Sequence, residues 1–284
     1  MTCKNSIYGR QINTSNNYLI SSNNWPDNIE LTGIFSDNIN NKFHNYSKIY
    51  IKYCSSDIYM GNSSSMGFYF DGINIFRETI RIFNYNLYKA TNILFCGTSA
   101  GGIGMIYHFS YLKNKYLLAN VKGLNDGGFL VNINTNINSY MYSLKYAFKL
   151  WNSNMSDFDP LIYHNNFIYD QNDIFYILNI PDAFLTLIDN NIYDNTYINK
   201  IISKSKDLYF LSNFFSSKCK DVHSFIPMGN DNNTSRSFYI SNINNITLSM
   251  AFEIFYFDNK NIKLYDNCDH ICNLSCPPWP NNLF

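Results

Sequence analysis

The sequence predicts an α/β fold in which a mostly parallel sheet is flanked by helices. Short runs of β-branched and aromatic residues, bounded by polar turns, alternate along the chain with longer runs whose apolar residues recur at helical spacing. Such an alternation places consecutive strands in parallel, with the connecting helices on the faces of the sheet. The chain has 284 residues, 46% of them hydrophobic, which is enough to fill the core of a single domain at residues 1–284.

Four short segments are predicted strands because they are rich in β-branched or aromatic residues and end in polar turns: Lys48–Cys54, Asn92–Cys96, Ala119–Asn125 and Phe252–Phe257. A helix is predicted over Gly72–Leu87, where four apolar residues share one face: Ile75, Phe76, Ile80 and Phe83. A second, largely buried helix follows Ser99. The stretch from about residue 130 to 220 is rich in Asn and reads as mostly helical, with poorly defined boundaries.

Charge and hydropathy exclude several classes of protein. The formal net charge is zero, and we find no basic stripe with interleaved aromatic residues, so neither nucleic acid nor an anionic surface is indicated as a partner. No apolar run approaches the roughly 18 residues that a membrane span needs. The first ten residues, MTCKNSIYGR, are polar and do not resemble a signal peptide. We expect a monomer without a membrane span.

Three cysteines lie close together in a cysteine-rich end at residues 266–280. Cys268, Cys272 and Cys276 are each separated by three residues, and His270 lies between the first two. Zinc hairpins use CxxC spacing and a second pair of ligands, so we predict disulfides here and no metal site. Disulfides imply an oxidising compartment, which conflicts with the polar start of the chain.

The stretch LFCGTSAGGIG contains a candidate nucleophile at Ser99. A predicted strand precedes it and an apolar helix follows, which is the context of the nucleophile turn in α/β-hydrolases. Gly97 and Gly101 would leave room for the sharp turn, and the Ala100 N–H at the helix N-terminus would donate to an oxyanion. The alternative is a glycine-rich turn or phosphate loop, but the Walker lysine and the GxGxxG spacing are absent.

A nucleophilic serine needs a base and an orienting acid, which follow it in the order Ser, Asp or Glu, His in this fold. His44 precedes Ser99, and His108 falls inside the following helix, so three candidate bases remain: His164, His223 and His270. The candidate acids are Asp126, Asp170, Asp173 and Asp258. For Asp126 we favour a structural role in the loop that follows its strand. The spacing alone leaves the choice of base and acid open.

Further motifs occur in a fixed order along nearly the whole chain: YCSSD (53–57), GTSAGG (97–102), LNDGGFL (124–130), YDQNDIFYIL (169–178), KCKDVH (218–223) and a cysteine-rich ending (255–277). Together they resemble the pectin acetylesterase/Notum family of carboxylesterases. The resemblance implies an α/β-hydrolase-like esterase that needs no cofactor, with Ser99 as nucleophile, Asp170 as acid and His223 as base. Asp170 is placed by YDQNDIFYIL and His223 by KCKDVH, which has one residue more than the family's Cys-x-x-His.

The resemblance implies a serine carboxylesterase that removes O-acyl groups from a substrate. The first expectation is deacetylation of an acylated polysaccharide, and the alternative is removal of a palmitoleoyl group from an acylated protein. A third possibility is a non-catalytic remnant that binds glycan or protein. The intact protein is expected to be secreted.

The chain departs from the family pattern at its start. The family's Gly-Gly-Gly-Trp-Cys segment, which supplies a second oxyanion donor, lies upstream of the motifs seen here. We therefore expect the first strands, those glycines and any signal peptide to be missing. Loss of one oxyanion donor lowers kcat by about 10²–10³-fold, so we expect this chain to be a poor esterase.

Overall fold

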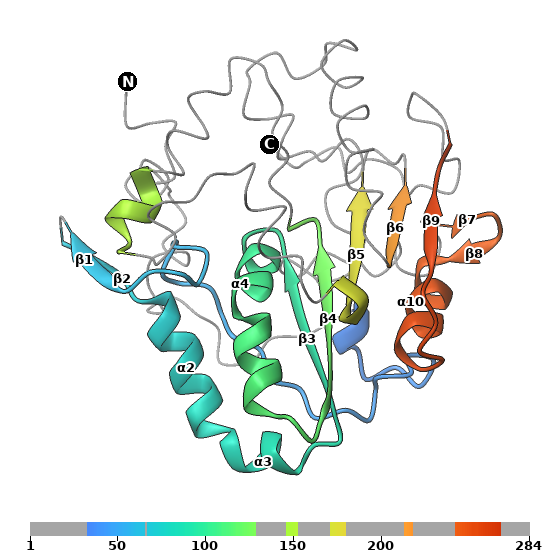
Figure 1. Cartoon of the computed structure of the whole chain (residues 1–284), viewed down its shortest axis with the longest axis horizontal. Helices are drawn as coiled ribbons and strands as arrows, with labels where there is room; N and C mark the ends of the chain where they lie inside the picture. The colour runs from blue at the N-terminus through green and yellow to red at the C-terminus, as the bar shows by residue number, and fades with distance from the viewer. Residues whose placement is uncertain are drawn as a thin grey trace, which may run out of the picture.

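A parallel sheet forms the centre of the computed structural model, which describes residues 33–65, 67–128, 146–152, 171–179, 213–217 and 242–267. Its five strands have the order β3-β4-β5-β6-β9, and every neighbouring pair is parallel (Figure 1). The strands are β3 (Asn92–Thr98), β4 (Asn120–Asp126), β5 (Ile174–Asn179), β6 (Phe214–Ser217) and β9 (Lys263–Tyr265). The predicted α/β class is confirmed.

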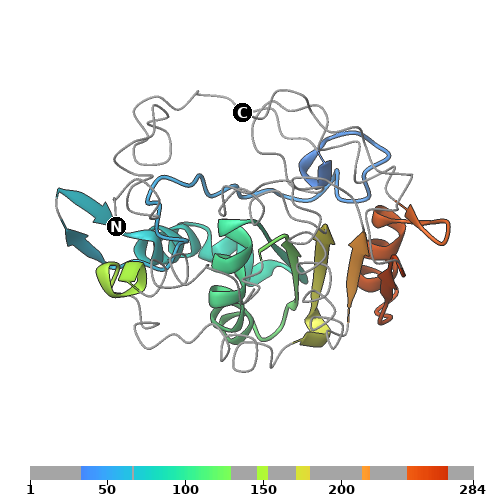
Figure 2. The same ribbon diagram turned by 90° about the horizontal axis from the view of Figure 1, so that it is seen from above.

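The helices and short hairpins lie around this sheet. The helical elements are η3 (Gly33–Phe35), α2 (Gly72–Ile82), α3 (Asn84–Lys89), α4 (Ala100–Lys115), η4 (Gln171–Asp173) and α10 (Leu248–Tyr256). Two antiparallel hairpins pair β1 (Ser63–Ser65) with β2 (Phe68–Phe70), and β7 (Asn242–Ile243) with β8 (Ile246–Thr247). Figure 2 shows the segment that begins at η3 running along the side of the sheet opposite α4. Among the described residues, none of the helices combines the length and the hydropathy of a membrane span.

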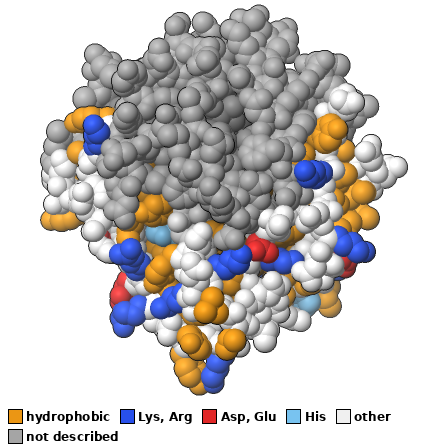
Figure 3. All heavy atoms as spheres, viewed as in Figure 1, with side chains coloured by type: hydrophobic (Ala, Val, Ile, Leu, Met, Phe, Trp, Pro, Cys, Tyr) orange, Lys and Arg blue, Asp and Glu red, His pale blue; other side chains and the backbone are white. Residues whose placement is uncertain are grey.

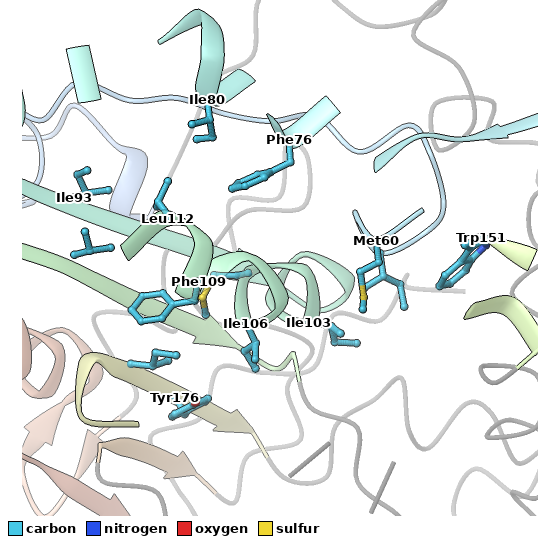
Figure 4. Packing of buried hydrophobic residues seen from close by; sticks show 14 of the residues in the cluster. Met60, Phe76, Ile80, Ile93, Ile103, Ile106, Phe109, Leu112, Trp151 and Tyr176 are labelled. Carbon is cyan, nitrogen blue, oxygen red and sulfur yellow. The ribbon is translucent and has the colours of Figure 1, made fainter. Parts of the chain in front are cut away.

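The two faces of the sheet bury separate apolar clusters, because successive strand residues point to opposite faces. On one face, Val121, Ile174, Tyr176 and Phe214 pack with α2 and α4. Figure 4 shows this packing, with Phe76 and Ile80 on one side of α4 and Tyr176 on the other. On the second face, the cluster consists of strand residues and of α10 with the η3 segment: Leu124, Phe175, Ile177, Phe215, Phe252, Phe255 and Phe43.

Lys122 is a buried charged side chain near the beginning of β4. It is only 4% exposed, and its ammonium donates to the carbonyls of Phe255 and Tyr256 at 2.8 and 3.0 Å, and to Asn259 Oδ1 at 2.6 Å. The two carbonyls belong to the C-terminal end of α10, which carries partial negative charge. Burial lowers the pKa of Lys122. The hydrogen bonds of Lys122 therefore connect the C-terminal end of α10 to strand β4.

Two predicted strands are wrong. Residues 48–54 form no strand with any described residue, although Tyr59 Oη donates to the Ile51 carbonyl at 2.9 Å. Residues 252–256 belong to helix α10, which begins after Thr247, whose hydroxyl accepts from the Met250 N–H. The segment is helical because it continues an apolar pattern that begins at Leu248. Leu248, Phe252 and Phe255 recur at helical spacing and are all buried.

Two further expectations need correction. The predicted helix over 72–87 is broken at Phe83, whose N–H still bonds to Thr79 O before α3 begins. Its buried face consists of Ile73, Phe76 and Ile80, while Ile75 is half-buried and Phe83 is 38% exposed. The stretch from 130 to 220, read as mostly helical, contains strands β5 and β6.

Candidate active site

Ser99 lies at a strained turn between β3 and α4. It occupies the N-cap of α4 with φ 52° and ψ −119°, a backbone conformation that costs a non-glycine residue about 1–3 kcal/mol. The Ser99 N–H donates to the Asp126 carbonyl at 2.9 Å. The Ser99 carbonyl accepts from the N–H groups of Gly102 and Ile103 at 2.9 and 3.1 Å. The turn is thus held from the neighbouring strand and from the helix.

The two glycines of the motif differ in how tightly they are enclosed. A Cβ on Gly97 would lie 2.1 Å from the Gly101 carbonyl oxygen, so no other residue fits there without a backbone shift. A Cβ on Gly101 would meet only the Tyr59 ring, at 4.0 Å, among the described residues. Close approach therefore requires glycine at 97, whereas position 101 has room for a methyl group.

Ala100 begins α4, and the helical hydrogen bonds to Ser99 O start two residues later, at Gly102. The N–H groups at this end of the 16-residue helix carry the positive end of its dipole. Ala100 is half-buried, as is Ser99. Such a helix start can stabilise negative charge on an oxygen close to the Ser99 side chain.

The end of β4 supports the start of α4. Asn125, which is fully buried, donates to the Gly102 carbonyl at 3.1 Å and accepts from the Gly128 N–H at 2.8 Å. Gly102 and Gly128 approach so closely that a Cβ on either would lie within 3 Å of the other's backbone. Asp126 holds Ser99 through its backbone carbonyl, and its carboxylate accepts a long, 3.5 Å hydrogen bond from Thr98.

A second buried carboxylate, Asp57, organises the loop that packs beside the turn. Its oxygens accept hydrogen bonds from the Ser55 hydroxyl and from three backbone N–H groups, those of Tyr59, Gly61 and Gly72. Asp57 has no solvent exposure, and burial raises its pKa although these hydrogen bonds oppose the shift. The loop includes positive φ angles at Ser56, Ile58 and Tyr59.

This loop, residues 55–61, packs closely against one face of α4. The Ile58 carbonyl lies 2.7 Å from where a Cβ on Gly104 would be. One turn further, His108 Nε2–H donates to the Tyr59 carbonyl at 2.7 Å, and its ring stacks on Phe76 with centroids 4.0 Å apart. Burial lowers the pKa of His108 to about 4. His108 is therefore a neutral structural residue, in agreement with its exclusion as a base.

Two candidate acids lie at the wrong end of the sheet. Asp173 directly precedes β5 and forms a 2.7 Å ion pair with Lys113 near the end of α4, far from the start of that helix. Asp258 follows α10 and is next to Asn259, which contacts Lys122 near the beginning of β4. In a parallel sheet, Ser99 lies at the opposite, C-terminal edge.

Asp170 and His223, the acid and base implied by the resemblance, lie outside the described residues, as do His164, His270 and the three clustered cysteines. Their positions along the chain can still be compared with the strands. His223 follows the C-terminal end of β6 by six residues. Asp170 precedes η4 and β5, whereas Asp182 follows the end of β5 by three residues.

Asp182 is absent from the candidate acids because β5 was not predicted as a strand. The signal for this strand is the run IFYILN (174–179), which is rich in β-branched and aromatic residues and is followed, after Ile180, by Pro181-Asp182. Within the described ranges, no three His, Cys, Asp or Glu side chains form a group that could hold a metal ion. Cys54 and Cys96, the two cysteines described, are free thiols, and burial raises the pKa of both.

Residues 2–207 match the family described as Pectinacetylesterase. The chain belongs to this family. Among curated proteins, it is 38% identical over 103 residues to the palmitoleoyl-protein carboxylesterase NOTUM of Schmidtea mediterranea, and 32% identical over 124 residues to that of Homo sapiens. These matches cover 34% and 40% of this chain but only 20% and 25% of the relatives, so the chain aligns with less than a third of their lengths.

A solved structure described as the Wnt deacylase Notum from Drosophila has the same fold. The TM-score is 0.78, the identity is 22%, and the superposition covers 95% of this chain and 85% of the other. The predicted α/β-hydrolase-like class and the resemblance to the pectin acetylesterase/Notum family are confirmed.

Proposed function

We propose that this member of the pectinacetylesterase family is a serine carboxylesterase that hydrolyses O-acyl esters. The observation that carries the proposal is the backbone of Ser99, held at φ 52° and ψ −119° where a parallel strand meets a helix N-terminus. Strain of this kind persists only where the surroundings fix it, and it exposes a side chain at the C-terminal edge of the sheet. A simple glycine-rich turn would place glycine, not serine, at this position.

In the proposed reaction, Ser99 Oγ attacks the ester carbonyl carbon while His223 accepts the hydroxyl proton. The Ala100 N–H stabilises the resulting oxyanion. His223 then protonates the leaving alkoxide, and a water molecule hydrolyses the acyl-serine by the same steps in reverse. The reaction uses no cofactor.

For the acid, strand order favours Asp182 over Asp170. Ser99 follows β3 and His223 follows β6, so both continue from C-terminal strand ends. Asp182 shares this property, whereas Asp170 precedes β5, whose six residues span about 20 Å at 3.3 Å each. We therefore propose Asp182 as the residue that orients His223, in place of Asp170.

The substrate class is an acylated polysaccharide or an acylated protein. The pectinacetylesterase match supports acetate as the acyl group, as first expected. The relatives named palmitoleoyl-protein carboxylesterases support the alternative of a long acyl chain on a protein. We also propose that the protein is secreted and monomeric; the cysteine-rich end at 266–280 supports an oxidising compartment.

The test is labelling with a fluorophosphonate probe, combined with hydrolysis of p-nitrophenyl esters of increasing chain length. Labelling should be lost in Ser99→Ala, and His223→Gln should lower kcat by about 10⁴-fold or more. His44→Gln is the matched control, because His44 precedes the serine and should leave kcat unchanged. Preference for acetate over octanoate would support the polysaccharide substrate, and the reverse the acylated protein.

Asp182→Asn and Asp170→Asn separate the two acids. We expect a loss of about 10³–10⁴-fold in kcat for Asp182→Asn and little change for Asp170→Asn. The reverse result would restore Asp170. Absence of labelling in a folded wild-type chain would contradict the enzyme proposal and support a non-catalytic binder of glycan or protein.

A further inference from the structure

The end of the molecule opposite Ser99 carries an exposed apolar tip. We define the tip by five exposed side chains from the α2–α3 region and the turn between α4 and β4: Ile82, Tyr85, Tyr88, Leu117 and Leu118. Tyr116 connects the two parts. Its hydroxyl donates to Asn84 Oδ1 at 3.0 Å, and its ring packs edge-on against that of Tyr88, with the ring centroids 6.1 Å apart. Figure 3 shows hydrophobic and basic side chains together at this end of the molecule, over α3 and the α4–β4 turn of Figure 1.

The exposure of the two leucines is unusually large. Leu117 is 80% and Leu118 is 92% exposed, whereas the adjacent Tyr116 is 3% exposed. A single exposed leucine needs no explanation, but two in succession beside exposed tyrosines form an apolar protrusion. A protruding apolar surface can insert its side chains into a partner, whereas a groove would enclose a side chain of the partner.

The charge around the tip has one sign. The sequence contains no Asp or Glu between Thr79 and Asn125, and its basic residues there are Arg81, Lys89, Lys113, Lys115 and Lys122. Arg81 pairs with Glu78, Lys113 pairs with Asp173, and Lys122 is buried. Lys89 and Lys115 have no carboxylate within ion-pair distance among the described residues; they lie over the rings of Tyr85 and Tyr116. The zero net charge of the whole chain conceals this segregation.

We propose that the tip docks the protein on an anionic bilayer surface. Leu117 and Leu118 would enter the acyl boundary, the tyrosines would lie at headgroup depth, and Lys89 and Lys115 would contact lipid phosphates. Exposed aromatic rings and lysines beside apolar side chains are the composition of membrane-interface contacts. A polyanionic glycan could bind the two lysines, but it offers no apolar surface against which Leu117 and Leu118 could be buried. A second copy of the chain would bring two sets of lysines together.

Docking through the tip fixes the orientation of the molecule. Ser99 follows the C-terminal end of β3, whereas the α4–β4 turn leads into the N-terminal end of β4. The nucleophile would therefore face away from the bilayer. Its substrate would be an acyl group presented from the aqueous side and not a lipid of the same bilayer.

The experiment is co-sedimentation of the full chain with vesicles of phosphatidylcholine mixed with phosphatidylserine, and with vesicles of phosphatidylcholine alone. Wild-type protein should sediment with the mixed vesicles. Leu117→Gln/Leu118→Gln should weaken this binding by about ten-fold or more, since burial of one leucine is worth about that factor. Lys89→Gln/Lys115→Gln should also weaken it about ten-fold or more, since each lysine near an anionic leaflet contributes roughly five-fold.

Ile39→Gln is the matched control, because Ile39 is also 80% exposed but lies outside the tip. It should bind as the wild type does, and thermal melts should show that all variants are folded. The proposal is overturned if wild-type protein stays in the supernatant with both vesicle types, or if the leucine variant binds unchanged. It is also overturned if the leucines instead support a dimer in sedimentation equilibrium, or if the lysines retain the protein only on heparin.

Discussion

The two ends of helix α4 differ in how closely the surrounding chain packs against them. At its N-terminus, small residues let the backbone of three segments approach closely, and the strained Ser99 is fixed by hydrogen bonds from β4 and α4. At its C-terminus, lysines and exposed leucines face solvent, and the polar contacts include an ion pair whose two side chains are about one third exposed and a hydrogen bond from Tyr116 to Asn84. Close backbone packing and buried hydrogen bonds are therefore concentrated at the end of α4 where chemistry is proposed.

The largest expected effect comes from filling the space at Gly97. Gly97→Ala would place a methyl carbon 2.1 Å from the Gly101 carbonyl, so the turn must shift. We expect a loss of about 4 kcal/mol in the free energy of unfolding, at the upper end of single substitutions. Urea denaturation followed by circular dichroism measures it.

Gly101→Ala is the control for this substitution, because the same methyl group would meet only the Tyr59 ring at 4.0 Å among the described residues. We expect no loss in the free energy of unfolding, and a gain of up to about 1 kcal/mol, since Ala is favoured over Gly in a helix by about that amount. Equal effects at both positions would show that the close approach is not what fixes this turn.

The second effect tests the loop that packs on α4. Asp57→Ala would leave the Ser55 hydroxyl and the N–H groups of Tyr59 and Gly61 without their buried acceptor. We expect a loss of about 3 kcal/mol in the free energy of unfolding, because each unsatisfied buried donor costs about 1–3 kcal/mol.

Asp37→Ala provides the comparison for Asp57. The Asp37 side chain is 92% exposed and pairs with Lys48 at the surface, so its loss should cost less than about 1 kcal/mol. If the two substitutions destabilise the protein equally, the Asp57 carboxylate does not organise the loop.

The third effect is a pH dependence of stability from His108. Its pKa is about 4 in the folded protein against 6.5 for an exposed histidine, because burial disfavours the charged ring. The unfolded chain therefore binds the proton first as the pH falls, and stability present above pH 6.5 is lost towards pH 4. Between pH 6.5 and about pH 5 the loss should approach about 2 kcal/mol.

His108→Gln keeps a donor for the Tyr59 carbonyl but removes the titration. The free energy of unfolding, measured by urea denaturation at several pH values, should fall less for this variant than for the wild type between pH 6.5 and about pH 5. The difference between the two decreases should be about 2 kcal/mol. Parallel pH profiles for the two proteins would assign the dependence to other groups.

The sequence predicted the parts of the fold in which local pattern and tertiary environment agree. β3, β4 and α4 were found because apolar strands and an apolar helix alternate around Ser99. Residues 252–257 were misassigned because their aromatic residues fit a period of two as well as a helical period, and only Thr247 marks the helix start. Segment 48–54 has strand composition, but strand pairing depends on a neighbour that composition does not specify.

For the candidate site, the sequence predicted the strand, turn and helix around Ser99, which the structure contains, but could not rank the acids. The structure places Asp173 and Asp258 at the N-terminal edge of the sheet, away from Ser99; for Asp173 this required knowing that β5 is a strand, and for Asp258 that Asn259 contacts Lys122. It also gave Asp57 a role that no motif predicted, since its three backbone donors come from residues up to 15 positions away. The contact with Gly72 depends on chain reversal, whereas Tyr59 and Gly61 lie only two and four positions from Asp57.

The smallest expected effect is at the other end of α4. Lys113 and Asp173 lie 2.7 Å apart, and their side chains are 35% and 36% exposed. An ion pair this accessible to water contributes about 0.5 kcal/mol and is screened by salt. A double-mutant cycle with Lys113→Ala and Asp173→Ala measures the coupling free energy. A value near that of the Asp57 contacts would contradict the contrast between the two ends, because the ion pair would then fix β5 to α4 as firmly as buried hydrogen bonds fix the turn at Ser99.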